Sequence, residues 1–430
     1  KHDTVAIRSG MEDSQWWPSE KLEELRLERL RTLLSKAGKH VPYYRDCFSQ
    51  LGLDPHSIRS LADLQKIPFL TKAVIRAEGD RMKSEIAKGL ARFNTGGSSG
   101  EPLIFFIGNE RVSHDVAAKW RATRWWGVDI GDPEIVVWGS PIELSAQDRL
   151  RQWRDRLMRT QLLPAFQMSE AKLDEFIATI TSTRPRVLFG YPSSISLLAR
   201  HAEKRGQSMS NLGIKVAFVT SERLYEEQRD AISRVFGCLV ANGYGGRDAG
   251  FIAHECPAGG MHLTAEDIIV EIVDRDGHVL APGQVGEIVV THLATSDFPF
   301  IRYQTGDMGA LSARLCGCGR GLPVLEEIQG RTTDFVVAAD GTVMHGLALI
   351  YPIRDLPGVA AFKVIQHSLN HTEVQIVANG DYSLAVANDI QSGIQARLGK
   401  NVTVDVQKVE AIQPERSGKF RYIVSHVPLP

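Results

Sequence analysis

The residues best suited to chemistry lie in a short glycine-rich stretch from Phe93 to Pro102. Seven of its ten residues are Thr, Ser, Gly or Pro, and an apolar run from Leu103 to Ile107 follows at once. A loop this rich in glycine can turn several backbone N–H groups toward one anion, and its hydroxyls add further donors. No lysine follows the last glycine, so this is not the common nucleotide loop that ends in Gly-Lys-Ser/Thr. The predicted polyphosphate-binding residues are Thr95, Gly96, Gly97, Ser98, Ser99 and Gly100, and a plain turn between two strands is the alternative.

A second group of residues has the types that bind a transition metal. His254 and Cys256 are two positions apart, and so are Cys316 and Cys318. Zinc favours four Cys or His ligands in a tetrahedron, and two short-spaced pairs from different turns can supply them. A fully ligated zinc leaves no open position for chemistry, so we predict a structural site. Unrelated buried thiols and a surface histidine are the alternative.

The composition restricts the class of protein. A chain of 430 residues exceeds what one hydrophobic core usually holds, so two or more domains are expected. A net charge of -1 argues against a nucleic-acid partner. No apolar run reaches the length of a membrane span, and the first residues contain no signal-peptide core. Five cysteines are an odd count for a disulfide framework, which favours a reducing compartment, and we expect the cytoplasm.

Helical periodicity is clearest in the first part of the chain. Leucines recur at helical spacing over residues 12–40, which predicts one amphipathic helix there. Thr71 is placed to cap a helix that starts near Lys72. A long helix is predicted at about 110–127, and it contains Trp120. Core packing is the ordinary role of such a tryptophan, and lining a substrate pocket is the alternative.

The middle of the chain alternates apolar strands with helices, which predicts a parallel sheet covered by helices. The expected strands are residues 135–138, 187–191, 216–219 and 239–242, and the expected helices are residues 169–183, 192–206 and 222–236. Ligands of such sheets bind beyond the carboxyl ends of the strands. Tyr191, Ser221, Glu222 and the stretch 242–248 follow those ends, and we therefore predict that they line a site.

The pattern changes in the last part of the chain. Short strands at 268–273 and 286–291, with turn signals between them, predict a β subdomain at about 260–329. A break at Gly330-Arg331 precedes a compact α+β unit with a helix near 384–398. The predicted fold class is α/β, with a large N-terminal domain of mostly parallel sheets and a β subdomain, plus a small α+β C-terminal domain.

Five separated stretches occur in an order that resembles a known family. They are Thr95 to Pro102, Asn242 to Asp248, Tyr303 to Asp307, Gly330 to Asp334 and Ser417 to Arg421. Together they resemble the adenylate-forming (acyl-activating) superfamily, and most closely its phenylacetate–CoA ligase-like branch. The stretches His40 to Arg45, Ile67 to Lys72 and Cys316 to Arg320 are also similar to that branch.

The resemblance implies an activity and a division of the chain. Residues 1–329 would be an AMP-binding domain and 330–430 a small mobile domain that turns about Gly330 to Asp334. The implied reaction joins a carboxylic acid to ATP, giving an acyl-adenylate and pyrophosphate, and then transfers the acyl group to coenzyme A. The implied cofactors are ATP, Mg²⁺ and coenzyme A, beside the zinc predicted above.

The resemblance also implies roles for particular residues. Asp248, Lys419 and Arg331 would be catalytic, with Asp248 on Mg²⁺ and Lys419 bridging the carboxylate and the α-phosphate. Besides the glycine-rich loop, the implied ATP-binding residues are Ser221, Glu222, Asn242, Gly243, Tyr244, Gly245, Asp307 and Arg331. The substrate pocket is expected at Trp120, Tyr191, Gly245 and Gly246, and the phenylacetate-like branch favours an aryl or arylalkyl acid.

Two positions depart from the family pattern, and alternatives stay open. Glu101 stands where many relatives carry lysine, and Asp248 stands where they carry glutamate. The acceptor could be a carrier-protein thiol, an amine or a hydroxyl instead of coenzyme A. The chain could also be a nucleotide-binding scaffold whose catalysis has decayed, or an unrelated metal-stapled binding protein. A homodimer is a further alternative for the assembly of the protein.

Overall fold

A computed structural model gives the fold of the chain. It describes residues 3–94, 103–138, 155–165, 167–329, 335–354, 356–412 and 422–427. Residues 95–102 of the glycine-rich stretch, Arg331, Lys419 and the expected hinge from Gly330 to Asp334 lie outside the described residues. The predicted boundary between residues 329 and 330 also falls at the edge of an undescribed stretch and stays a prediction.

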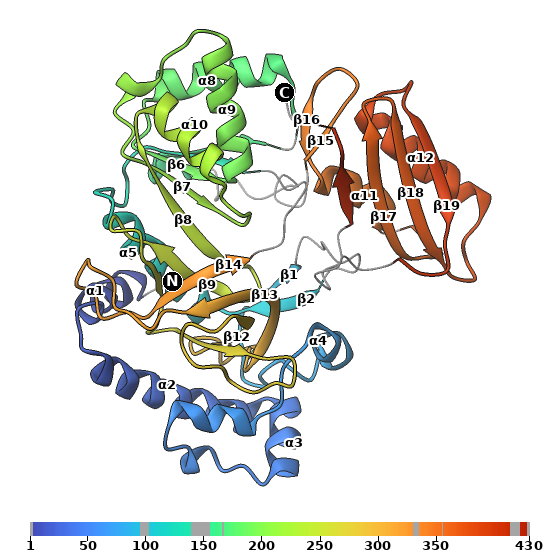
Figure 1. The fold of residues 1–430 in the computed structure, drawn as a ribbon. Helices are drawn as coiled ribbons and strands as arrows, with labels where there is room; N and C mark the ends of the chain where they lie inside the picture. Colours follow the sequence, from blue (N-terminus) through green and yellow to red (C-terminus); the bar gives the residue numbers. More distant parts are fainter. Residues whose placement is uncertain are drawn as a thin grey trace.

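One large mixed sheet forms the centre of the molecule (Figure 1). Its parallel half consists of β4 (Thr160–Pro164), β3 (Glu134–Trp138), β6 (Val187–Gly190), β7 (Val216–Thr220) and β8 (Leu239–Gly246), in that spatial order. The four predicted strands are therefore confirmed. Three helices pack on one face of this half, and they are α8 (Glu170–Thr183), α9 (Pro192–Lys204) and α10 (Glu226–Phe236). Alternate residues point to the opposite face, where Phe189 and Phe218 pack against Ala122 of α5 (Asn109–Arg124).

The antiparallel half continues the same sheet from β8. It consists of β9 (Gly250–Glu255), β10 (Met261–Leu263), β14 (Val324–Gln329), β13 (Tyr303–Leu311), β12 (Gly286–His292) and β11 (Ile268–Val273). The strands predicted for a β subdomain are present, but they are not a separate sheet. The sheet is mixed rather than mostly parallel, because the hairpin between β8 and β9 reverses the chain direction within it. Sequence runs identify each strand but carry no signal for that continuity.

Elements from the first part of the chain pack against the antiparallel half. They are α1 (Thr4–Ser14), α2 (Ser19–His40), α3 (Pro42–Leu51), α4 (Lys72–Glu78) and the two-stranded sheet of β1 (Ala91–Asn94) and β2 (Ile104–Ile107). The single helix predicted over 12–40 is wrong, because the chain breaks between α1 and α2, and Pro18 precedes α2 in an extended conformation. The predicted cap is confirmed, since the Thr71 hydroxyl accepts the Val74 backbone N–H at 3.1 Å. No helix in the described residues is long and apolar enough to cross a membrane.

The C-terminal part forms its own sheet, in the order β19 (Thr403–Lys408), β18 (His371–Ala378), β17 (Val359–Ser368) and β20 (Ile423–Ser425). The helices α11 (Leu347–Arg354) and α12 (Leu384–Leu398) share its core. This unit lies to one side of the large sheet in Figure 1. The α/β fold with a large sheet-containing N-terminal part and a smaller α+β C-terminal part is confirmed.

A hairpin of β15 (Phe335–Val337) and β16 (Val343–His345) lies between the two parts. Its outer strand pairs with β5 (Gln167–Met168), which belongs to the large part. Val337 and Val343 are buried in the core of the large part, whereas Val336 and Met344 are buried in the C-terminal core. The side-chain amide of Gln366 donates to the Val337 carbonyl at 2.6 Å and accepts its N–H at 3.1 Å. The hairpin therefore contributes one face to each core.

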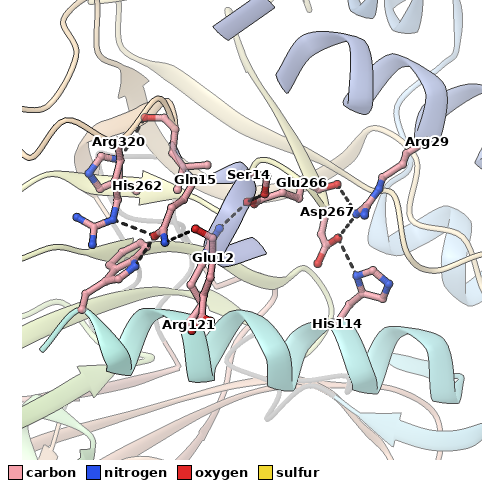
Figure 2. A network of polar contacts seen from close by, with 12 residues as sticks. Glu12, Ser14, Gln15, Arg29, His114, Arg121, His262, Glu266, Asp267 and Arg320 are labelled. Atoms are coloured by element: carbon pink, nitrogen blue, oxygen red, sulfur yellow. Dashed lines mark hydrogen bonds and ion pairs between the residues drawn. The ribbon is translucent and has the colours of Figure 1, made fainter. Parts of the chain in front are cut away.

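Buried charges fasten the N-terminal helices to the large sheet, as Figure 2 shows. Arg121 of α5 donates from Nη1 to Glu266 Oε1 at 2.6 Å, and the Ser14 hydroxyl of α1 donates to the same oxygen at 2.7 Å. Arg29 of α2 and His114 of α5 both bond Asp267 Oδ1, at 2.7 Å and 2.8 Å. Each carboxylate thus joins two helices at one point just before β11.

The Arg121–Glu266 pair gives a test of this fastening. Both side chains are at most 2% exposed, so removing one partner leaves a buried, uncompensated charge. Glu266→Ala should lower the free energy of unfolding by about 3–5 kcal/mol, measured by urea denaturation. The double variant Arg121→Met/Glu266→Leu should be clearly more stable than Glu266→Ala. Equal losses in both variants would show that packing, and not charge pairing, controls this contact.

Candidate active site and metal centre

The end of β8 and the hairpin that follows place the predicted site residues. Asn242, Gly243, Tyr244 and Gly245 all lie on β8, with Gly246 as its last residue. The pairing of β8 with β9 shifts register between Tyr244 and Gly245. A Cβ at Gly245 would lie 2.3 Å from the Gly250 carbonyl oxygen, so only glycine fits there. The glycines in this motif therefore bring two backbones together at the strand end.

Two predicted residues from distant stretches meet at this place. Tyr244 Oη donates to Asp307 Oδ2 at 3.1 Å, which joins β8 to β13. Burial, with the neighbouring Asp307 carboxylate, raises the pKa of Tyr244 well above its usual value. The phenol therefore stays protonated and holds the carboxylate beside its ring. An aromatic face next to a carboxylate suits a nucleoside, since the base can stack and the ribose hydroxyls can donate.

Asp248 lies beside this pair and is held by a residue of the same β13 strand. Tyr303 Oη donates to Asp248 Oδ2 at 2.6 Å, and the Ala249 backbone N–H donates to Oδ1 at 3.1 Å. A Cβ at Gly246 would lie 2.7 Å from Asp248 Oδ1. No helix that Asp248 could cap follows it, because β9 begins at Gly250. The carboxylate is an oxygen ligand of the type that Mg²⁺ prefers.

The other predicted residues lie at the ends of neighbouring parallel strands. Ser221 follows β7 with a φ of 73°, a left-handed conformation that non-glycine residues rarely adopt. Glu222 accepts a short hydrogen bond from the Ser193 hydroxyl. Tyr191 stacks on Trp138 with ring centroids 4.2 Å apart. Trp120 is half-buried on α5 and makes no ring contact among the described residues, so nothing places it in the pocket.

Glu255 and Arg111 support this site, although no sequence pattern predicted it. Glu255 Oε2 accepts the Asn242 backbone N–H at 2.8 Å and also pairs with Arg229. Arg111 of α5 donates to the Arg247 carbonyl at 2.8 Å. Each supports the strand end from another element. Their side chains are ordinary charged residues in sequence, so only the fold shows what they support.

The candidate metal centre is built from a turn and a loop. Cys256 and His262 flank the turn between β9 and β10, and Cys316 and Cys318 lie in the loop between β13 and β14. Their four ligand atoms all lie within 4.8 Å of one another. Cys256 Sγ is 3.7 Å from Cys316 Sγ, and His262 Nε2 is 3.2 Å from Cys318 Sγ. A tetrahedron with Zn–S bonds of about 2.3 Å separates its sulfurs by about 3.8 Å, so the donor set fits zinc.

The predicted ligand His254 lies outside this cluster of side chains, and His262 is its fourth member. His254 and His262 are directly opposite each other on β9 and β10, but only the His262 ring reaches the thiols. His262 Nδ1 is 3.2 Å from the Leu322 carbonyl oxygen, so a proton on Nδ1 leaves Nε2 for the metal. The Cys256 turn, with Pro257 and two glycines before His262, is a hairpin signal that could have identified this ligand.

Parts of this chain match known protein families, and nearly the whole chain is similar to known proteins. Residues 134–295 match the family described as AMP-binding enzyme, and residues 336–426 match the CapK C-terminal domain. A phenylacetate-coenzyme A ligase of Thermus thermophilus is 29% identical over 332 residues, which cover 74% of this chain and 72% of that protein. Protein CapK of Staphylococcus aureus is 22% identical over 410 residues, covering 94% of this chain and 90% of that protein.

A solved structure gives the same fold. The crystal structure of 2-hydroxyisobutyryl-CoA ligase with 2-HIB-AMP and CoA, in the thioesterification state, superposes with a TM-score of 0.69 at 19% identity. The match covers 97% of this chain and 92% of that one. The fold and the AMP-binding match support an adenylate-forming enzyme. Within that superfamily, the chain is similar to the phenylacetate–CoA ligases.

Proposed function

We propose that this enzyme activates a carboxylic acid with ATP and then transfers the acyl group to coenzyme A. One observation carries the proposal: the hydrogen bond that joins Tyr244 of β8 to Asp307 of β13, beside Asp248. It unites two of the stretches that carry the family resemblance at the carboxyl end of the parallel strands, where such sheets bind ligands. The similar ligases named above support the same reaction class.

In the first step, a carboxylate oxygen attacks the α-phosphorus of ATP and pyrophosphate leaves. Asp307 would accept the ribose hydroxyls, the Tyr244 ring would face the adenine, and Asn242 would offer an amide to its edge. Asp248 would hold Mg²⁺, which when bound neutralises phosphate charge. Fixed donors and cations help most in such a step, because two anions must approach each other. For that reason we assign the phosphates to the Thr95–Gly100 loop and to the cations Arg331 and Lys419.

In the second step, the thiol of coenzyme A attacks the acyl carbonyl and AMP leaves. Lys419 would have to withdraw so that the thiol can enter, which is why we propose that the C-terminal part moves. The acid is proposed to be aryl or arylalkyl, since Tyr191 and Trp138 provide stacked rings at the strand ends. A carrier-protein thiol, an amine or a hydroxyl would be an alternative acceptor, and a product assay distinguishes them.

We further propose that Cys256, His262, Cys316 and Cys318 bind a structural zinc. The loop that carries Cys316 and Cys318 docks on the end of α1, where Arg320 Nε donates to Gln15 Oε1 at 3.0 Å. A Cβ at Gly321 would lie 1.9 Å from the Trp17 carbonyl oxygen, so the loop backbone and the chain after α1 are in close contact. Zinc at this position would hold α1 against the sheet.

The reaction class can be tested by pyrophosphate release. With ATP and Mg²⁺, the enzyme should release pyrophosphate only when a suitable carboxylic acid is present, and Asp307→Asn should lower that release. A coupled assay run with and without acid, including phenylacetate, measures it. Hydrolysis of ATP to ADP and phosphate without acid would identify an unrelated ATPase.

The role of Lys419 can be tested by separating the two steps. Lys419→Ala should slow adenylation by roughly 10²-fold or more, the scale of losing one electrostatic stabiliser of the transition state. Thioester formation from supplied acyl-AMP should stay near the wild-type rate, because thiol attack needs no such bridge. Lys400→Ala, an exposed lysine of the same part, is the matched control. Equal loss in both steps would remove Lys419 from this role.

The zinc site can be tested by metal analysis. The purified protein should contain about one zinc per chain, and Cys316→Ser and His262→Ala should lower both zinc content and melting temperature. Cys47→Ser, outside the cluster, should change neither. If His262→Ala keeps its full zinc content, another residue must be the fourth ligand. Wild-type protein without zinc would rule the site out.

A further inference from the structure

One buried histidine of the large sheet has no structural role that its contacts explain. His254 is 0% exposed on β9, and neither of its ring nitrogens has a hydrogen-bond partner among the described residues. The other buried histidines do have partners: His201 bonds Asp174, His262 bonds Leu322 and His292 bonds Asp115. A buried polar group without a partner costs free energy, so its presence requires an explanation.

His254 lies directly behind the nucleotide-site strand. It is opposite Gly243 in the β8–β9 pairing, and a Cβ at Gly243 would lie only 3.6 Å from His254 Cδ2. Gly243 belongs to the stretch that also holds Tyr244 and leads to Asp248. The imidazole therefore lies next to a point of β8 that carries no side chain.

A row of aromatic rings leads from the strand ends to this histidine. Tyr191 stacks on Trp138, and the row continues through Phe189 and Phe218, with neighbouring ring centroids 4.2–6.1 Å apart. Phe218 then contacts His254 at 5.7 Å. On the other side of the imidazole, Phe251 stacks at 5.3 Å and is only partly buried. The middle of the row, Phe189 and Phe218, is apolar, and the row leads to a polar ring whose nitrogens have no partner among the described residues.

We propose that His254 is the polar end of the acid pocket and selects an aryl acid that carries a hydroxyl or amino group on its ring. This inference rests on the proposed function. A neutral imidazole has one N–H donor and one nitrogen acceptor, which matches a hydroxyl or amino group that also donates and accepts. An unsubstituted aryl acid would leave both nitrogens unpaired, so the site would discriminate against it. The carboxylate at the other end would lie toward Asp248 and the phosphates.

The experiment compares paired acids in the purified protein, whose zinc content is measured first. The rate of acid-dependent pyrophosphate release is measured for phenylacetate and benzoate and for their ring-hydroxy and ring-amino derivatives. In the wild type, kcat/KM should be at least about tenfold higher for the best substituted acid than for its unsubstituted parent. In His254→Phe the ratio should fall to about one or below, and His254→Gln, which keeps a donor and an acceptor, should restore part of it.

Stability provides a second readout that a purely structural histidine would not give. His254→Phe removes two unpaired polar atoms and places a ring between Phe218 and Phe251, so its melting temperature without ligand should equal or exceed that of the wild type. His201→Phe is the matched control, since it should lower the melting temperature by breaking the bond to Asp174 and leave the acid ratio unchanged. Zinc content is measured in every variant because Cys256 is close in sequence.

The outcomes separate this inference from the proposed function. Pyrophosphate release with several acids, but equal kcat/KM for substituted and parent acids, overturns the role of His254 and leaves the proposed function standing. An unchanged ratio in His254→Phe overturns it as well, and so does a loss of stability that His254→Gln does not repair. If no acid supports pyrophosphate release, the proposed function fails first and the inference fails with it.

Discussion

The whole arrangement depends on how closely β8 and β9 approach each other. β8 is the last parallel strand of the sheet and also the first antiparallel one, so both halves of the sheet are joined through it. Gly245 permits that approach, since a side chain there would collide with the Gly250 carbonyl oxygen. From this junction Tyr244 reaches Asp307 and Asp248 reaches Tyr303, both across to β13. Without the junction, the residues of the proposed site would lie on separate sheets.

Buried charge pairs perform a different task, which is to determine where the N-terminal helices lie. Glu266 and Asp267 are neighbours in sequence and accept from Arg121, Ser14, Arg29 and His114 on three helices. Burying such charges costs free energy that the pairing must offset, so their contribution lies more in defining one arrangement than in net stability. Helices held by hydrophobic contacts alone could slide along the sheet. A carboxylate oxygen that two helices share restricts both helices to few positions.

The sequence predicted the strands and most helices, because runs of apolar residues and helical periodicity are local signals. The break at Pro18 was missed, since leucines at helical spacing after it concealed that a separate helix precedes it. The fourth residue of the Cys/His cluster was missed for a spatial reason. His254 is nearer to Cys256 in sequence, but His262 lies across the hairpin, and only strand pairing decides which ring reaches the thiols. Likewise, the support of Asn242 by Glu255 depends on a contact between strands that no local pattern records.

The hairpin of β15 and β16 has a mechanical consequence for the proposed movement of the C-terminal part. The hairpin is shared by two hydrophobic cores. Val337 and Val343 face the core of the large part, and Val336 and Met344 face the C-terminal core. Any rotation of the C-terminal part must therefore either pull β16 away from β5 or bend the chain between β16 and β17. Among the described residues, two residue pairs join β16 to β5, whereas Gln366 bonds both backbone groups of Val337. The contact of the hairpin with the large part is therefore the weaker one. If the C-terminal part moves, we expect the hairpin to move with it.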